Sequence, residues 1–265
     1  MSDYLLGHEP AIRFVLSVAI FVLVASGEAL FPRRVQQIGR LVRWPNNLGL
    51  VALNTVLVRL LLPTAAVGLA VIAEARGWGL LNAIALPAWL ALPLAVLVLD
   101  LAIYLQHRLF HAVPALWRLH RMHHADLEFD VTTGLRFHPV EIALSMGIKF
   151  LVIAALGPSG LAVLIFEVLL NATSLFNHGN VRLPGRVDRI LRRIVVTPDM
   201  HRVHHSVHRE ETNSNFGFNL PWWDRLLGTY RSQPRDGHEG MTIGIGQFRT
   251  SRDLRLDRML IQPMR

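Results

Sequence analysis

Cysteine is absent from the 265 residues of the chain, and charged residues make up only 17% of it. The first absence excludes disulfides, iron–sulfur clusters and zinc sites held by thiolates, and a cysteine nucleophile. The second, together with a hydrophobic content of 52% and a positive mean hydropathy of +0.36, is typical of a membrane protein. Imidazole and carboxylate groups must therefore supply any metal site.

The sequence also lacks any basic segment interleaved with aromatic residues, so we expect no nucleic-acid partner. Arginine and lysine outnumber acidic residues by 27 to 19, but this excess falls in loops and in the C-terminal third. Such a distribution suits an anionic membrane surface or an acidic protein partner.

Three long apolar runs predict membrane-spanning helices. They comprise residues 11–31, 48–73 and 84–104. The first is about 31 Å long as a helix, which matches the hydrocarbon core of a bilayer. A loop with four arginines follows it, and the positive-inside rule places this loop in the cytoplasm. These arginines are Arg33, Arg34, Arg40 and Arg43.

Two shorter apolar runs, residues 140–156 and 161–176, flank the turn sequence Gly157-Pro158-Ser159-Gly160. Each has the minimum length for a span, so they predict a helical hairpin that either spans or re-enters the membrane. From Arg182 onward no apolar run is long enough to span. We expect this part to form a cytoplasmic cap packed against the helix ends.

The predicted fold is therefore all-α. It is an integral membrane protein with about three spanning helices, the hairpin, and a cytoplasmic helical cap that holds a His-rich dimetal site. The predicted domains are the N-terminal transmembrane helices (1–94), a dimetal catalytic domain that includes the hairpin 140–176 (95–231), and a cytoplasmic C-terminal tail (232–265).

Eleven of the 13 histidines lie between positions 107 and 208, and most of them form three clusters. On a helix, residues at i, i+3 and i+4 share one face, close enough to hold one ion or to bridge to a second. Without a metal, so many imidazoles near a membrane would leave costly unsatisfied nitrogens. The clusters are the pair His107 and His111, the triplet His120, His123 and His124, and the triplet His201, His204 and His205.

With these clusters the sequence resembles the fatty acid hydroxylase and sterol desaturase superfamily of membrane di-iron enzymes, and most of all its bacterial sterol desaturase family proteins. That family's pattern is His-x3/4-His, then His-x2-His-His, then a later His-x2-His-His. The resemblance covers roughly residues 95–231. It extends to Arg136-Phe137-His138-Pro139-Val140-Glu141, Asn177-His178, Asp199-Met200-His201, Asn215-Phe216-Gly217 and Trp223-Asp224-Arg225-Leu226-Leu227-Gly228-Thr229-Tyr230.

The resemblance implies nine metal ligands: His107, His111, His120, His123, His124, His178, His201, His204 and His205. His138 is either a further ligand or a support for the fold, because Pro139 can start the next helix at its first turn.

Three polar residues are candidates for supporting roles beside the ligands. Asp100 lies seven residues before His107, so it can accept a proton from a ligating imidazole or serve helix packing. Asn171, seven residues before His178, can point into the site, and Asn177 directly precedes that histidine as in the family. His238 lies far from the clusters, and we expect it to be solvated.

Imidazole ligands with almost no carboxylate suit iron and zinc alike. The sequence has no His-Glu-x-x-His motif of a zinc hydrolase and no Glu-x-x-His motif of a carboxylate di-iron bundle. The resemblance implies two iron ions and O2 as co-substrate. It also implies hydroxylation or desaturation of an unactivated C–H bond in a fatty acyl, sterol, hopanoid or other isoprenoid lipid. Zinc as the occupant, a membrane zinc hydrolase and a non-catalytic metal-binding membrane protein are the alternatives.

Electrons for such chemistry must come from a separate reductant, since the chain lacks a Gly-rich dinucleotide motif and cysteine. We expect an electron-transfer protein to dock on an arginine-rich cytoplasmic face, although anionic head groups would suit the same face. The expected location is the bacterial inner membrane, with the metal site on the cytoplasmic side and substrate drawn from the bilayer. The docking arginines are Arg118, Arg121, Arg182, Arg186, Arg189, Arg192 and Arg193.

Overall fold

The computed structural model describes residues 2–62, 64–84 and 86–265, and within these ranges the chain is helical apart from two isolated β-bridges. The predicted all-α class is confirmed. Five stretches among the described residues are long and apolar enough to cross a membrane, and the second of them comprises more than one helix. They are Glu9–Leu30, Arg40–Ala83, Ala88–Ala112, Pro139–Leu156 and Gly160–Asn177.

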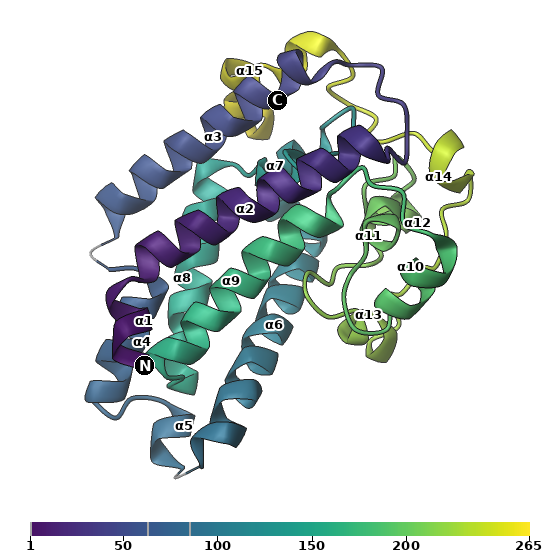
Figure 1. The fold of residues 1–265 in the computed structure, drawn as a ribbon. Coiled ribbons are helices and arrows are strands. Elements are labelled where there is room, and N and C mark those ends of the chain that lie inside the picture. The colour runs from purple at the N-terminus through teal and green to yellow at the C-terminus, as the bar shows by residue number, and fades with distance from the viewer. Residues whose placement is uncertain (1, 63, 85) are drawn as a thin grey trace.

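The apolar bundle is built around α9 (Gly160–Asn177), which packs against α2 (Glu9–Leu30) and α6 (Ala88–Ala112). These three helices run side by side along a common direction (Figure 1). Helix α4 (Ala66–Ala75) packs against α9 and against α8 (Pro139–Leu156). The core between them contains buried side chains of four helices, among them Val67, Leu99, Ile153 and Phe166.

The second apolar run does not form the single span predicted over residues 48–73. Helix α3 begins earlier, at Arg40, and ends at Leu61, and α4 begins at Ala66. Leu62 is extended (φ −113°, ψ 125°), which is the conformation that a following proline favours; Pro63 itself lies outside the described residues. Arg40 and Arg43 therefore lie inside a helix and not in the predicted loop.

The third apolar run also has different bounds from the predicted 84–104. A short α5 (Leu80–Ala83) comes first. Pro87 is extended and directly precedes α6, which then continues to Ala112. At 25 residues, α6 is about 38 Å long, more than the hydrocarbon thickness of a bilayer. The same helix can therefore cross the apolar layer and carry histidines beyond it.

The predicted hairpin forms as two helices, α8 and α9, of 18 residues each. Gly157 ends α8 in the left-handed conformation (φ 66°), which glycine adopts without strain. Ser159 then caps α9, because its side chain accepts a hydrogen bond from the backbone N–H of Ala162.

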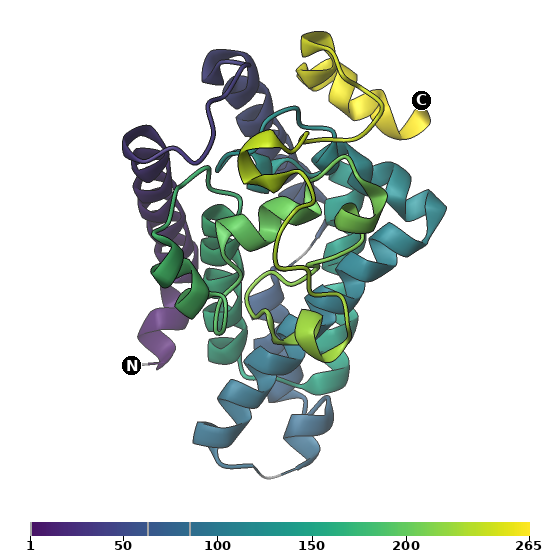
Figure 2. The ribbon, with the colours of Figure 1, turned by 90° about the vertical axis from the view of Figure 1, so that its right-hand side faces the viewer.

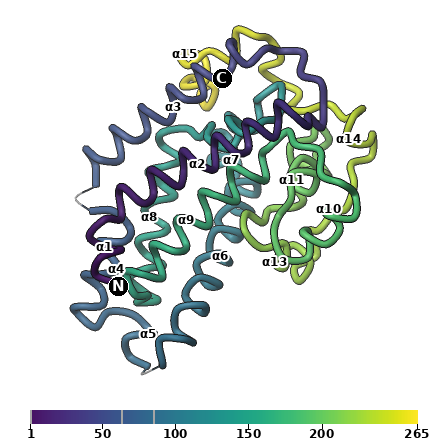
Figure 3. The backbone as a smooth tube through the Cα atoms, in the orientation of Figure 1, coloured from purple at the N-terminus to yellow at the C-terminus, as the bar shows by residue number. Residues whose placement is uncertain are grey.

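The remaining helices cover one end and one side of the bundle (Figure 2). Residues 232–265, predicted as a tail, pack onto the rest of the protein: Met259 joins Leu50 and Met122 in one buried cluster. The two termini lie at opposite ends of the bundle (Figure 3). These helices are α7 (Pro114–His124), α10 (Gly185–Leu191), α11 (Pro198–His204), α12 (Arg209–Thr212), α13 (Trp222–Leu226), α14 (Gly237–Gly240) and α15 (Leu256–Ile261). The short 3-10 helices are η1 (Thr133–Leu135), η2 (Ser251–Leu254) and η3 (Gln262–Met264), and α1 (Ser2–Gly7) precedes the bundle.

Candidate metal centre

Nine histidines, the same nine that the sequence predicts as ligands, form two groups. Within each group, every histidine has a nitrogen atom that lies within 4.8 Å of those of the other members. We call one the cavity-side group, because two of its histidines line a cavity between the helices, and the other the cap-side group. The cavity-side group consists of His107, His111, His120, His124 and His204. The cap-side group consists of His123, His178, His201 and His205.

Each His-x2-His-His triplet is divided between the two groups. In α7, His120 and His124 join the cavity-side group, and His123 joins the cap-side group. At α11 the division is reversed: His201 and His205 lie on the cap side, and His204 lies on the cavity side. Residues at i and i+4 are nearly aligned on a helix, whereas i+3 is rotated to the other flank. The sequence left open whether a triplet holds one ion or also reaches a second. In the structure each triplet contributes histidines to both groups.

Proline fixes the start of both triplet helices, and α11 also has a polar cap. Pro114 and Pro198 occupy the first turns of α7 and α11, where a missing N–H is tolerated and φ is already helical. At α11 the Thr197 side chain accepts a hydrogen bond from Met200 N. The histidines are thus at the C-terminal ends of short helices with well-defined starts.

Four of the histidines donate their Nδ1–H to an oxygen that can only accept. His107 Nδ1 lies 2.8 Å from Phe216 O, and His178 Nδ1 lies 2.8 Å from Ser174 O. His204 Nδ1 lies 2.7 Å from Ser214 O. His120 Nδ1 lies 2.6 Å from Glu141 Oε1. The proton must therefore be on Nδ1 in each neutral ring, which leaves a lone pair on Nε2.

These Nε2 atoms point at one another. His107 Nε2 and His120 Nε2 are 3.1 Å apart in the cavity-side group. In the cap-side group, His178 Nε2 lies 3.3 Å from His123 Nε2 and 3.2 Å from His201 Nε2. His107 and His120 thus bring two lone pairs to this distance, and these repel unless a cation lies between them. Two nitrogens bound at 2.0–2.1 Å to one ion are about 2.9–3.4 Å apart, so the spacing fits a shared metal ion.

Burial keeps the histidines beyond the membrane helices neutral. It lowers the pKa of His178 to about 4, with a smaller contribution from His120. Burial and the neighbouring imidazoles also lower the pKa of His123, His201 and His205 well below the usual value. Each of these rings is therefore uncharged at neutral pH and keeps one nitrogen without a proton, which is available to a metal. Several have no hydrogen-bond partner in the described structure, including both nitrogens of His124 and of His205.

Glu141 is a supporting residue that the sequence analysis did not assign. It is the second residue of α8 after Pro139, buried, and 21 positions away from the histidine that it contacts. A carboxylate partner fixes the orientation of a ligating imidazole and raises its basicity. The sequence feature that pointed to Glu141 was its place in the family motif that ends in Pro139-Val140-Glu141.

The prediction that Asp100 accepts a proton from a ligating histidine is wrong. Its Oδ2 accepts hydrogen bonds from Trp223 Nε1 (2.8 Å) and Leu220 N (3.3 Å). Seven residues share a helix face but are about 10 Å apart along the axis, too far for a direct contact with His107. Asp100 instead fastens α6 to the cap beside α13.

The other predicted supporting residues have different positions. Asn171 lines a cavity that reaches the cavity-side group. Asn177 is buried and donates to Phe218 O (3.0 Å). His138 lies outside both histidine groups: it precedes α8, its Nδ1 accepts from Val140 N, and its Nε2 lies 3.2 Å from Leu260 O. His238, expected to be solvated, is buried with 5% exposure.

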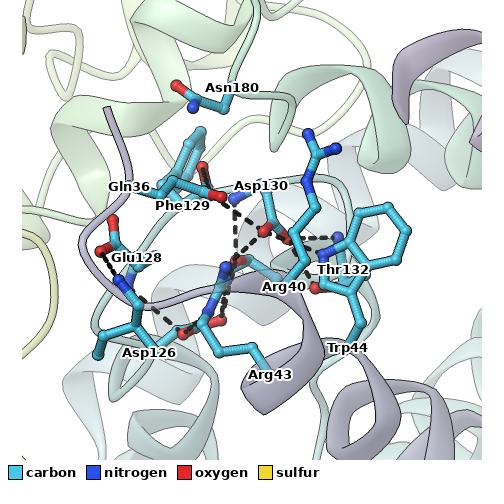
Figure 4. A network of polar contacts seen from close by, with 12 residues as sticks. Gln36, Arg40, Arg43, Trp44, Asp126, Glu128, Phe129, Asp130, Thr132 and Asn180 are labelled. Atoms are coloured by element: carbon cyan, nitrogen blue, oxygen red, sulfur yellow. Dashed lines mark hydrogen bonds and ion pairs between the residues drawn. The ribbon is translucent and has the colours of Figure 1, made fainter. Parts of the chain in front are cut away.

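A buried ion-pair network holds the loop that follows α7 (Figure 4). Arg43 of α3, fully buried, donates to both carboxylate oxygens of Asp126 (2.8 and 2.7 Å) and pairs with Asp130. Burial alone would raise the pKa of Asp126, but Arg43 outweighs it and lowers that pKa to about 2. Asp126 comes two residues after His124. The network therefore fixes the end of α7, which carries ligands of both groups.

Aromatic rings cover the cap-side group. The Phe137 ring stacks on His123 (centroids 4.5 Å apart), and the Phe129 ring stacks on His178 (5.6 Å). Arg202 is fully buried, and its guanidinium carbon lies over the Phe129 ring, 5.1 Å from the ring centroid. These contacts limit the rotation of the imidazoles.

A cavity of about 340 Å³ lies between α2, α3, α6, α8 and α9 and reaches the cavity-side group at His107 and His120. Phe110, Phe137 and Phe218 form much of its wall at that end. In the part of the chain that the structure describes, none of the cap-side histidines lines this cavity. The two groups thus differ in their access to a ligand.

The predicted arginine surface is smaller than expected. Arg121 and Arg192 are buried: the first donates to Gln262 O and Arg265 O, and the second pairs with Asp188. The arginines that stay exposed are Arg118, Arg182, Arg186, Arg189 and Arg193.

Comparison with known proteins agrees with this arrangement. A sequence model described as fatty acid hydroxylase matches residues 92–229. The chain is 33% identical over 143 residues to ornithine lipid hydroxylase OlsE of Rhizobium tropici, which covers 54% of this chain and 42% of that protein. It is 28% identical over 159 residues to human alkylglycerol monooxygenase, with 58% of this chain and 34% of that protein covered.

Human cholesterol 25-hydroxylase is 29% identical over 139 residues, which covers 52% of this chain and 50% of that protein. The chain therefore spans half or less of the length of these curated relatives. No solved structure matches the chain at a significant level.

Proposed function

The chain belongs to the fatty acid hydroxylase family, and from this premise we propose that it is a membrane enzyme that uses two iron ions and O2 to hydroxylate an unactivated C–H bond of a lipid. The observation that carries the proposal is the pair of buried histidine groups, one of which opens into a cavity between membrane helices. The named hydroxylases and monooxygenases among the relatives support the reaction type.

The residues at the mouth of the cavity-side group suit this role. His107 and His120 would hold one ion through Nε2, because their Nδ1 atoms donate to Phe216 O and Glu141. Glu141 keeps the proton of His120 on Nδ1. When bound, the ions would supply activation of O2 and accept the electrons that the reaction needs. Phe110 and Phe218 border the same space and would exclude bulk water from it.

We further propose that the protein is in the bacterial inner membrane with this site on the cytoplasmic side, and that a separate electron-transfer protein docks on the cap. Arg186, Arg189 and Arg193 are exposed in and just after α10. An acidic partner would be attracted to such a cluster.

The test is comparative lipid mass spectrometry of cells with the active protein and with a His120→Ala variant. We expect a lipid that gains one oxygen only with the active protein, in the presence of O2. Hydrolysed lipids formed without O2 would contradict the proposal and support a zinc hydrolase. A purified protein that holds two irons but oxidises no lipid would contradict it in favour of a metal-binding role.

A further inference from the structure

We propose, on the basis of the proposed function, that Lys149, with Glu167 and Arg13, forms a subsite for the polar group of the substrate within the membrane. This subsite would bind an uncharged head group that bears hydroxyl or amide groups. It would set which carbon of the lipid lies beside the cavity-side group.

The three side chains form a chain of ion pairs at one end of the cavity. Lys149 Nζ lies 2.5 Å from Glu167 Oε1, and Arg13 Nη2 lies 2.8 Å from Glu167 Oε2. Arg13 also pairs with Glu9 (2.6 Å). All three members of the subsite line the cavity. Exposure falls from 38% for the Arg13 side chain to 12% for Lys149 and 5% for Glu167, so the pairs lead inward from a rim.

Their position in the bundle is unusual for charged residues. Lys149 and Glu167 lie in the interior of α8 and α9, two of the five segments apolar enough to cross a membrane. Charges at such positions are costly and mark functional sites in most membrane proteins. Lys149 is, moreover, the single lysine among 27 lysine and arginine residues. Hydrophobic residues of similar size would join the helices at a lower cost.

Lys149 has hydrogen-bonding capacity beyond its carboxylate partner. An ammonium group has three donors, and in the described structure Lys149 has one hydrogen bond, to Glu167. Two N–H groups therefore remain for an oxygen atom of a ligand in the cavity. A lysine offers these donors in freely rotating positions, unlike the planar fork of arginine.

The cavity wall also presents acceptors without donors. Asn54, which is 8% exposed, uses Nδ2 to donate to Phe137 O (2.9 Å), so its Oδ1 points elsewhere, and this oxygen is buried without a partner. Gln106 Oε1 is likewise buried and without a partner, while its Nε2 donates to Ser145. Both residues line the cavity. A ligand with O–H or N–H groups would satisfy them.

The balance of charge favours an uncharged ligand. Two cations, Arg13 and Lys149, face two carboxylates, Glu9 and Glu167. A phosphate or carboxylate would add a charge that no group compensates in a medium of low dielectric constant. A head group with hydroxyl or amide groups can accept from Lys149 and donate to Gln106, which bonds Ser145 one turn away on α8, without adding charge.

The subsite is at a defined distance from the metal centre. Glu141, the partner of His120, and Lys149 are eight residues apart on α8. Ser145 lies between them and lines the same cavity. Eight residues correspond to about 12 Å along a helix. The oxidised carbon would therefore lie within roughly 12 Å of the polar group.

The experiment measures retention of three deuterated probes by the purified, metal-loaded protein in detergent, followed by lipid mass spectrometry. The probes are 1-O-hexadecylglycerol, hexadecyl phosphate and hexadecane. We expect the wild type to retain the glycerol ether best. Lys149→Met should lower that retention about tenfold, the value of a charge-assisted hydrogen bond, and leave hexadecane unchanged. The control is Leu151→Met on the same helix, 73% exposed, which should match the wild type.

The double variant Lys149→Met with Glu167→Gln separates binding from helix packing. It removes the ion pair without leaving a buried charge, so a purely structural pair predicts recovery of wild-type retention. Under the proposal, retention of the glycerol ether stays low. Recovery in the double variant, equal retention by Lys149→Met, or a wild-type preference for hexadecyl phosphate would each overturn the subsite.

The same probes distinguish this proposal from the proposed function. If the wild type retains the glycerol ether and Lys149→Met does not, but neither oxidises any lipid, the subsite is supported and the hydroxylase function fails. If the wild type inserts oxygen at a defined carbon and Lys149→Met inserts it at the same carbon with the same efficiency, the function is supported and the subsite fails.

Discussion

The cavity-side and cap-side histidine groups are built from the same residue type and the same triplets, yet their surroundings differ. The cavity-side group reaches the space between the membrane helices through His107 and His120. The cap-side group is covered by Phe129 and Phe137, and all four of its histidines are buried. In the proposed reaction, the substrate would meet the first group, while the second would act from behind a wall of side chains.

Backbone carbonyls orient His107 and His204 of the cavity-side group and His178 of the cap-side group, but the groups differ in one partner. In the cavity-side group a carboxylate, Glu141, accepts from His120. In the cap-side group the corresponding partner of His178 is the backbone carbonyl of Ser174. A side-chain partner can be removed by substitution, whereas a backbone partner cannot. A substitution of Glu141 can therefore change the support of the cavity-side group while the Ser174 carbonyl still holds His178.

The largest effect is expected from removal of one ligand of either group. His107→Ala and His123→Ala should each lower lipid oxidation by more than the 10–100-fold typical of losing an outer partner. Each should also lower the metal content from two ions to about one per chain. Activity and metal analysis of the purified variants check this. His138→Asn is the matched control and should keep both ions. Full activity in His123→Ala would refute a role for the cap-side group.

Arg43→Met tests whether the two groups share a support. It leaves Asp126 and Asp130 buried without their main partner, which should cost about 3–5 kcal/mol of unfolding free energy. Thermal unfolding in detergent measures the loss. Both groups should lose metal together, because the loop held by Arg43 follows the helix that supplies both. Arg59→Met, exposed on the same helix, should change stability by less than about 0.5 kcal/mol.

Glu141→Gln sharpens the difference between the groups. The amide oxygen can still accept from His120, but without the negative charge that strengthens the ligand. We expect a 10–100-fold loss of metal affinity or activity, confined to one of the two ions. Metal titration of the purified variant would show one weakened and one unchanged site. Equal weakening of both sites would contradict the division into two groups.

The pH dependence of the metal-free protein tests the burial of the same histidines. His178 has a pKa of about 4 in the fold against about 6.5 when unfolded. Below pH 6.5 the unfolded chain therefore binds more protons than the folded chain. Stability should be unaffected above pH 6.5 and should fall between pH 6.5 and 4. Unfolding midpoints across this range, with and without bound metal, provide the measurement; a metal-loaded protein should resist the change until the metal is lost.

Eight of the nine clustered histidines could be identified from the sequence because their spacing is local, whereas His178 came from the family resemblance. Spacing at i, i+3 and i+4 determines which side chains share a helix face, and His107, His120 and His201 each begin such a pattern. The division into two groups depends instead on how α6, α7, α9 and α11 cross, which no local pattern contains.

The supports of the site could not be read from spacing. Arg43 and Asp126 are 83 positions apart, and His120 and Glu141 are 21 apart. The break between α3 and α4 was available from the sequence, because a residue before proline disfavours helix. Averaged hydropathy concealed it, since both helices are apolar.

The facing Nε2 atoms of His178 and His201 have a consequence for the amount of the protein in a cell. A metal ion that binds these atoms in the fold, and only weakly in the unfolded chain, shifts the folding equilibrium by mass action. Chains made while metal is scarce would unfold more often and be removed by proteases. Cellular abundance would then follow metal supply after translation, with no change in the rate of synthesis.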